Sequence, residues 1–269
     1  MKIKYIFIIF ILFLSVSNAQ KPYSLNNVLN FVPTSISAIS FFENPYLNNV
    51  DDTTNLWFIG LAYQPAKMGF DELSNSALNI RYCLNKKIDL LLGANYFGFD
   101  LFNEFSSSIS GLFKFDDLTL GGTISYNKAT VKDFNSESII TIDLLGRMNL
   151  SSYFTVGYLL TNLNRAYYSS YSKTVYQNAI FSINFHPIDK FNCEFGGILR
   201  LGYRPSVFLS TKFLIVRDVI SANLKLNSYP LYTSVGVSIT PFSWFNFVTY
   251  INYLDNFGFD RTFLTEFKW

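Results

Sequence analysis

The one histidine of the chain is the first residue to weigh for catalysis. His186 directly precedes Pro187, in a segment whose residues predict a tight turn. A catalytic histidine needs a nucleophile and an orienting acid within reach, and the sequence indicates neither beside this turn. It also contains no glycine-rich phosphate loop, histidine-rich metal motif or nucleophile elbow. We therefore expect a protein that is not an enzyme, without a metal or cofactor.

Seven charged residues are the other candidates for chemistry, and each lies among residues that alternate between apolar and polar. They are Arg81, Asp143, Arg147, Glu194, Arg200, Lys225 and Glu266. Mixed signs on one face could line a pore or orient a carboxylate-bearing ligand. The alternative, which we favour for any single residue, is that these charges pair across neighbouring strands and satisfy a polar interior.

The alternation itself predicts β-strands whose two faces meet different surroundings. In residues 137–148 the apolar set alternates with a polar set, namely Ile140, Ile142, Leu144 and Met148 against Thr141, Asp143 and Arg147. Apolar residues at every second position are typical of a membrane β-barrel. A lysine or arginine that faces lipid near the midplane costs about 2–4 kcal/mol, so the register is strongly fixed. The seven charges are therefore expected to face the lumen.

The end of the chain predicts the strand that closes such a barrel. Phe263, Phe267 and Trp269 fall on the lipid side and oppose polar residues, which are Thr262, Glu266 and Lys268. Closure leaves no unpaired strand edge in hydrocarbon. We expect the barrel-assembly machinery to recognise this C-terminal strand.

The whole pattern predicts an all-β fold, a transmembrane antiparallel up-and-down β-barrel of about fourteen strands, with about twelve as the alternative count. The expected strands are 55–63, 75–84, 88–99, 105–115, 118–127, 137–148, 152–163, 174–185, 190–203, 206–215, 219–227, 231–240, 244–254 and 259–269. Every second connection between these strands is a tight turn, and the other connections are mostly longer. Outer-membrane barrels show the same asymmetry, with short periplasmic turns and longer outer loops.

The N-terminus predicts export. Residues 1–19 combine a basic start, an apolar run and small residues before a cleavage point, which indicates a signal peptide. Residues 20–54 do not fit the strand pattern and form either a lumen plug or a periplasmic leader, and residues 55–269 form the barrel. We expect the outer membrane of a Gram-negative-type bacterium as the location.

Composition excludes one class of partner. The formal net charge is +2, and removing Lys2 and Lys4 with the signal peptide makes it neutral. A neutral chain lacks the basic patch that nucleic acid requires. The two cysteines fall on opposite faces, with Cys83 toward the lumen and Cys193 toward lipid. A disulfide needs a short Cβ separation, so both thiols are expected to be free.

Short motifs occur at the Asn44-Pro45 step and at residues 68–73, 97–104, 160–164 and 256–264. Together they resemble outer-membrane barrels of the PorV and PorQ group, in the wider FadL-like superfamily. The resemblance implies a FadL-like fold and either service to type IX secretion or transport of hydrophobic compounds. The glycine-rich stretch that usually opens these proteins is missing from residues 34–42.

Three functions follow as hypotheses. The first is an accessory or scaffold barrel that resembles the PorV-like proteins and has a secretion-system partner. The second is a FadL-like passive transporter of small hydrophobic molecules. The third is a structural barrel of the envelope. Outer-membrane lipid surrounds the protein in all three.

Overall fold

The fold was obtained as a computed structural model. It describes residues 56–65, 73–133, 136–168, 173–174, 177–188, 190–201, 203–217, 219–229, 231–254 and 258–269. The predicted signal peptide, the segment 20–54 and the motif residues 44–45, 68–72 and 256–257 lie outside these ranges. Within the described part of the chain, we find no helix long and apolar enough to cross a membrane.

Fourteen strands of the described residues form one closed antiparallel barrel, which confirms the predicted fold class and strand count. Their bounds are β1 (Trp57–Gln64), β2 (Ser74–Asn85), β3 (Ile88–Phe99), β4 (Phe102–Phe115), β5 (Leu118–Val131), β6 (Glu137–Asn149), β7 (Phe154–Thr161), β10 (Asn178–Ile188), β11 (Phe191–Arg200), β12 (Ser206–Val216), β13 (Ile220–Ser228), β14 (Leu231–Phe242), β15 (Phe245–Leu254) and β16 (Gly258–Lys268).

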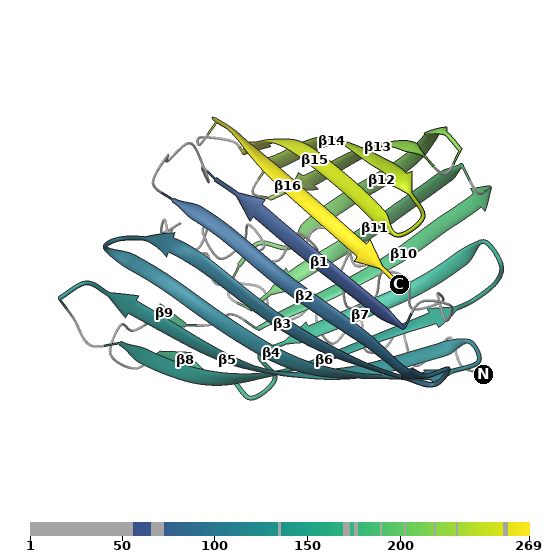
Figure 1. Cartoon of the computed structure of the whole chain (residues 1–269). Coiled ribbons are helices and arrows are strands. Elements are labelled where there is room, and N and C mark those ends of the chain that lie inside the picture. The colour runs from purple at the N-terminus through teal and green to yellow at the C-terminus, as the bar shows by residue number, and fades with distance from the viewer. Residues whose placement is uncertain are drawn as a thin grey trace.

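Each barrel strand pairs with its neighbours along the chain, and β16 closes the barrel against β1. Figure 1 shows these two strands side by side, with the C-terminus at the end where β1 begins. The backbone N–H of Trp57 donates to the carbonyl of Trp269 at 2.9 Å, and the reverse hydrogen bond measures 3.1 Å. The closing strand therefore leaves no unpaired edge beside the first residues of β1.

Burial alternates along the strands because successive side chains point to opposite faces of the sheet. On β13, Ser221, Asn223 and Lys225 are buried, whereas Leu226 is exposed. On β6, Thr141 is buried, whereas the next residue, Ile142, is 43% exposed. The inner face is thus mostly polar and the outer face mostly apolar, the reverse of a soluble barrel.

Glycines opposite bulky side chains keep some rings flat against the inner wall. Gly236 pairs with Tyr250 and Gly196 pairs with Phe208 across neighbouring strands. A Cβ at either glycine would overlap the facing ring. These glycines therefore let the rings lie on the sheet instead of projecting across the interior.

Two local features differ from the sequence prediction. Residues 164–173 were predicted as a long connection before a strand from residue 174. Instead, β8 (Tyr167–Tyr168) and β9 (Lys173–Thr174) pair there as a small hairpin, and the next barrel strand, β10, begins at Asn178. Tyr168 is buried there, and this burial raises the pKa of its phenol, as do the nearby Glu104 and Glu137 carboxylates.

His186 was predicted in a turn, and this prediction was wrong, because β10 continues through Pro187 to Ile188. Pairing of β10 with β7 ends at Phe185 and Phe154, and a register shift follows on the β11 side. Proline lacks a backbone N–H, so it is tolerated at such an irregularity near a strand end. His186 is consequently a strand residue whose parity directs its side chain inward.

Candidate functional site

A buried ion cluster lies on the inner face, near the end of the barrel with short turns. The Asp89 carboxylate on β3 lies 2.8 Å from the Arg81 guanidinium on β2 and 2.9 Å from the Lys114 ammonium on β4. Asp89 is 0% exposed. Three neighbouring strands thus contribute one carboxylate and two cations, and the cluster carries a net charge of one positive unit.

A continuous polar row crosses the inner face from one end of the barrel to the other. Cross-strand pairing aligns Asn149, Thr155, Asn184, Glu194, Ser210, Lys225, Ser234, Asn252 and Asp260. Adjacent strands lie about 4.8 Å apart, so the row is about 38 Å long. With strands tilted by roughly 40°, it rises about 25 Å along the barrel axis, about the height of the apolar band of such barrels.

Hydrogen bonds connect members of this row at both of its ends. Thr155 Oγ1 donates to Asn149 Oδ1 at 3.1 Å near the short-turn end. Near the other end, Asn252 Nδ2 donates to Asp260 Oδ1 at 2.6 Å. Two of the predicted charges, Glu194 and Lys225, flank Ser210 in the middle and are 1% and 3% exposed.

Lys225 and the remaining predicted charges have defined contacts. The Lys225 ammonium lies 4.4 Å from the centroid of the Tyr250 ring, a cation–π geometry. Asp143 Oδ1 accepts the backbone N–H of Asn162 at 2.8 Å. Arg200 Nε donates to Asn178 Oδ1 at 2.9 Å. Glu266 Oε2 accepts from Asn246 Nδ2 at 2.7 Å.

One of the seven candidate charges, Arg81, forms an ion pair across neighbouring strands, and its partner Asp89 was not among the seven. In the described part of the chain, the ion pairs are Arg81–Asp89 and Lys114–Asp89. Asp89 and Lys114 were missed because both stand beside tight turns. Strand alternation could have identified Asp89, because this residue stands between the apolar Ile88 and Leu90 on β3.

An aliphatic row also lies on the inner face, four residues along β6, β10 and β11 from the polar row. Pairing aligns Leu112, Gly121, Leu145, Leu159, Ile180 and Ile198 across six strands. Ile180, Ile198 and Phe208 form a buried cluster against which Leu159 packs. The inner wall is therefore amphipathic, with one apolar row among polar ones.

A polar pocket of about 480 Å³ opens at the short-turn end, where the polar row begins. Its lining includes Asp117, Arg147, Asn149, Ser151, Thr155 and His186. Arg147, one of the predicted charges, has its Nη2 atom 3.4 Å from Asn149 Oδ1, a long hydrogen bond. Sequence reasoning missed this pocket because it assigned His186 to a turn.

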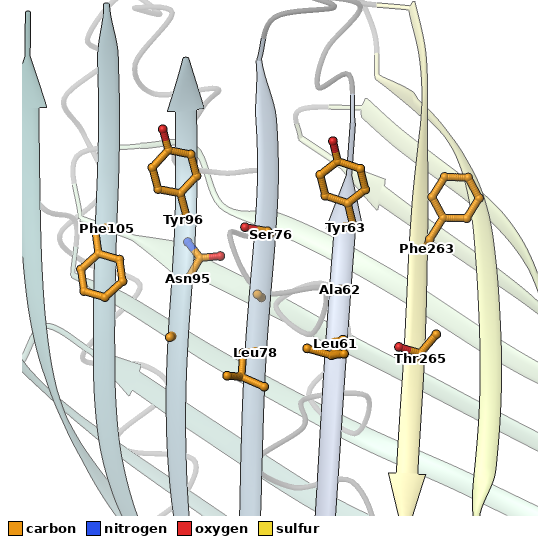
Figure 2. Close-up of a pocket in the computed structure, with 12 residues that line it drawn as sticks. Leu61, Ala62, Tyr63, Ser76, Leu78, Asn95, Tyr96, Phe105, Phe263 and Thr265 are labelled. Carbon is orange, nitrogen blue, oxygen red and sulfur yellow. The ribbon is translucent and has the colours of Figure 1, made fainter. Parts of the chain in front are cut away.

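An apolar groove of about 460 Å³ lies on the outer face of β16 and β1 to β4. Figure 2 shows Tyr63 and Tyr96 with their hydroxyls directed toward the same end of the barrel, the end with the longer connections. Leu61, Leu78 and Phe263 also line it. Tyrosines with this placement are typical of the boundary between lipid tails and headgroups.

The closing strand and the thiols are placed as follows. Phe267 packs against Phe245, with ring centroids 5.3 Å apart, and Phe263 stacks with Phe247 at 6.5 Å. Trp269 is exposed beyond the end of β16. Cys83 is buried, Cys193 is half-buried, and both are free thiols, as predicted.

Comparison with known proteins identifies the fold. No family model matches the sequence, and no curated protein matches it. Among solved structures, the chain is similar to the outer membrane protein Omp33 of Acinetobacter baumannii, with a TM-score of 0.56 and 8% identity over 80% of this chain and 98% of that one. It is also similar to the CymD monoaromatic hydrocarbon channel, with a TM-score of 0.56 and 10% identity over 83% and 90% of the two chains. The chain thus has the fold of outer-membrane β-barrels.

Proposed function

We propose that this protein is an outer-membrane channel for small polar solutes. The observation that carries the proposal is the polar row of nine residues, which follows the inner wall from Asn149 to Asp260. Members of the row such as Glu194, Ser210 and Lys225 are buried, so the row conducts only in a form whose lumen is open. In that form it offers water and small solutes hydrogen bonds without an apolar barrier. Water-filled barrels have this arrangement, with lipid outside and polar groups inside.

Charge on the inner wall supports passage of solutes of either sign near the middle of the barrel. Glu194 and Lys225 lie on the same row with Ser210 between them. Opposite charges so close together leave a small net field, in contrast to the rings of one sign that select strongly for one ion. Selectivity is then expected from the ends of the barrel.

A second candidate is transport of small hydrophobic molecules, as the FadL-like resemblance implies. The aliphatic row from Leu112 to Ile198 favours it, because a polar channel has no need of an apolar row. The similarity in fold to a hydrocarbon channel is compatible with it. The PorV-like secretion role, a structural role, and the role of residues 20–54 as a lumen plug or a periplasmic leader stay predictions.

Swelling of proteoliposomes tests the proposal. The chain from Gln20, refolded into vesicles, is exposed to an isosmotic solution of a small neutral sugar or a short-chain amino acid. We expect swelling with both solutes, either for this form or for a second form that lacks residues 20–54. Swelling in the second form alone would also identify the segment as a plug. Impermeable vesicles in both forms would contradict the channel proposal.

A further inference from the structure

The polar pocket at the short-turn end is held in place by backbone contacts of four elements. The backbone N–H of Asn149 donates to the carbonyl of Asp117 at 2.8 Å, which ties the end of β6 to the turn between β4 and β5. The N–H of His186 donates to the carbonyl of Tyr153 at 3.0 Å, which ties β10 to the turn before β7. The lining is therefore preorganised, and a ligand would not have to order it.

The pocket presents several hydrogen-bond donors toward one space. Arg147 contributes a planar guanidinium, which suits carboxylate and phosphate oxygens. Ser151 Oγ accepts the N–H groups of Tyr153 and Phe154, both at 3.2 Å, so its own hydroxyl hydrogen is available to donate. Two donors thus stand on different elements of the same pocket.

His186 also lines the pocket, through atoms other than Nδ1. Its Nδ1 atom is buried and makes no hydrogen bond within the described residues. Water does not reach this atom, so a solute in the pocket would contact other atoms of the ring. The volume of about 480 Å³ admits a small molecule and falls within the usual range of ligand pockets.

We propose that this pocket binds the oxyanion group, carboxylate or phosphate, of a small solute. The inference rests on the proposed channel function, for which the pocket would concentrate solute at the short-turn mouth. Arg147 holds the oxyanion and Ser151 donates a hydrogen bond to it. Asp117 lines the same space and repels a second negative charge, so singly charged solutes are preferred over highly charged ones.

Direct binding tests the proposal without any need for conduction. The whole chain, folded in detergent micelles, is titrated with sodium acetate or inorganic phosphate at constant ionic strength in a calorimeter. Arg147→Gln is expected to weaken binding about tenfold or more, because a hydrogen bond to a charged group has been removed. Asp117→Asn is expected to strengthen it. Lys87→Gln removes an equal charge from an exposed turn at the same end and is the matched control.

Acetate and phosphate distinguish the two kinds of solute that could carry the oxyanion group. Tighter binding of acetate indicates a carboxylate solute, and tighter binding of phosphate indicates a phosphorylated one. Equal loss of affinity in Lys87→Gln and Arg147→Gln would overturn the site, because it would show only general attraction of anions. No binding to the folded wild-type chain would also overturn it. Neither result would bear on permeation, so failure of this inference is distinct from failure of the channel proposal.

Discussion

Replacing Asp89 by asparagine is expected to destabilise the barrel strongly. The side chain keeps its shape, but Arg81 and Lys114 lose the carboxylate that lies 2.8 Å and 2.9 Å from them. Removing one partner of a buried ion pair costs about 3–5 kcal/mol. The Lys114 side chain is 11% exposed and can reach some solvent, so we expect the lower end, about 3 kcal/mol.

Urea unfolding of the refolded barrel in phospholipid vesicles measures this free energy, with tryptophan fluorescence as the signal. Asp116→Asn, at an exposed turn, is the matched control and should change the free energy of unfolding by no more than about 0.5 kcal/mol. Adding Lys114→Met to Asp89→Asn should restore at least about 1 kcal/mol, because one of the two stranded cations is gone. An Asp89→Asn variant within about 1 kcal/mol of wild type would refute the assignment of the cluster as a buried ion network.

Three further predictions concern the wall of the barrel. Gly236→Val should lower the free energy of unfolding by about 1–3 kcal/mol, because its side chain overlaps the Tyr250 ring; an unchanged urea midpoint would contradict this packing. Ile142→Arg places a cation on the exposed apolar face and should cost about 2–4 kcal/mol in lipid vesicles, whereas an effect near zero would place that face in water. A thiol-specific reagent should modify Cys193 faster than Cys83 in the folded protein, and both should react after unfolding; equal rates in the folded protein would contradict this placement, and no reactive thiol in urea would indicate a disulfide between them.

The number of strands was predictable from sequence because two signals coincide in this chain. Lipid on one side and polar groups on the other force strict alternation, as on β13, where Ser221 and Lys225 are buried and Leu226 is exposed. Tight turns between alternate strands then separate one strand from the next. Strand ends were less predictable: β5 extends to Val131, beyond the predicted end at residue 127, because β4 continues to pair with it.

The candidate sites were only partly predictable, for a physical reason. Parity assigns a residue to a face, but contacts depend on which strands are neighbours and in what register. Thr155 and Asp260 are separated by more than a hundred positions in sequence, yet cross-strand pairing places both on the same polar row. Asp89 was overlooked beside a turn although its parity was readable, and His186 was misplaced because the proline after it suggested that the strand had ended.

The most direct test of the channel is the conductance of single barrels in a planar bilayer, using the form that conducts, with or without residues 20–54. Ser210→Trp places a large ring in the middle of the polar row, and Thr211→Trp places the same ring on the opposite face of β12. A solute path along the row predicts that Ser210→Trp lowers the conductance by about half or more, while Thr211→Trp leaves it unchanged. Equal conductance in both variants and wild type would contradict a path along this row.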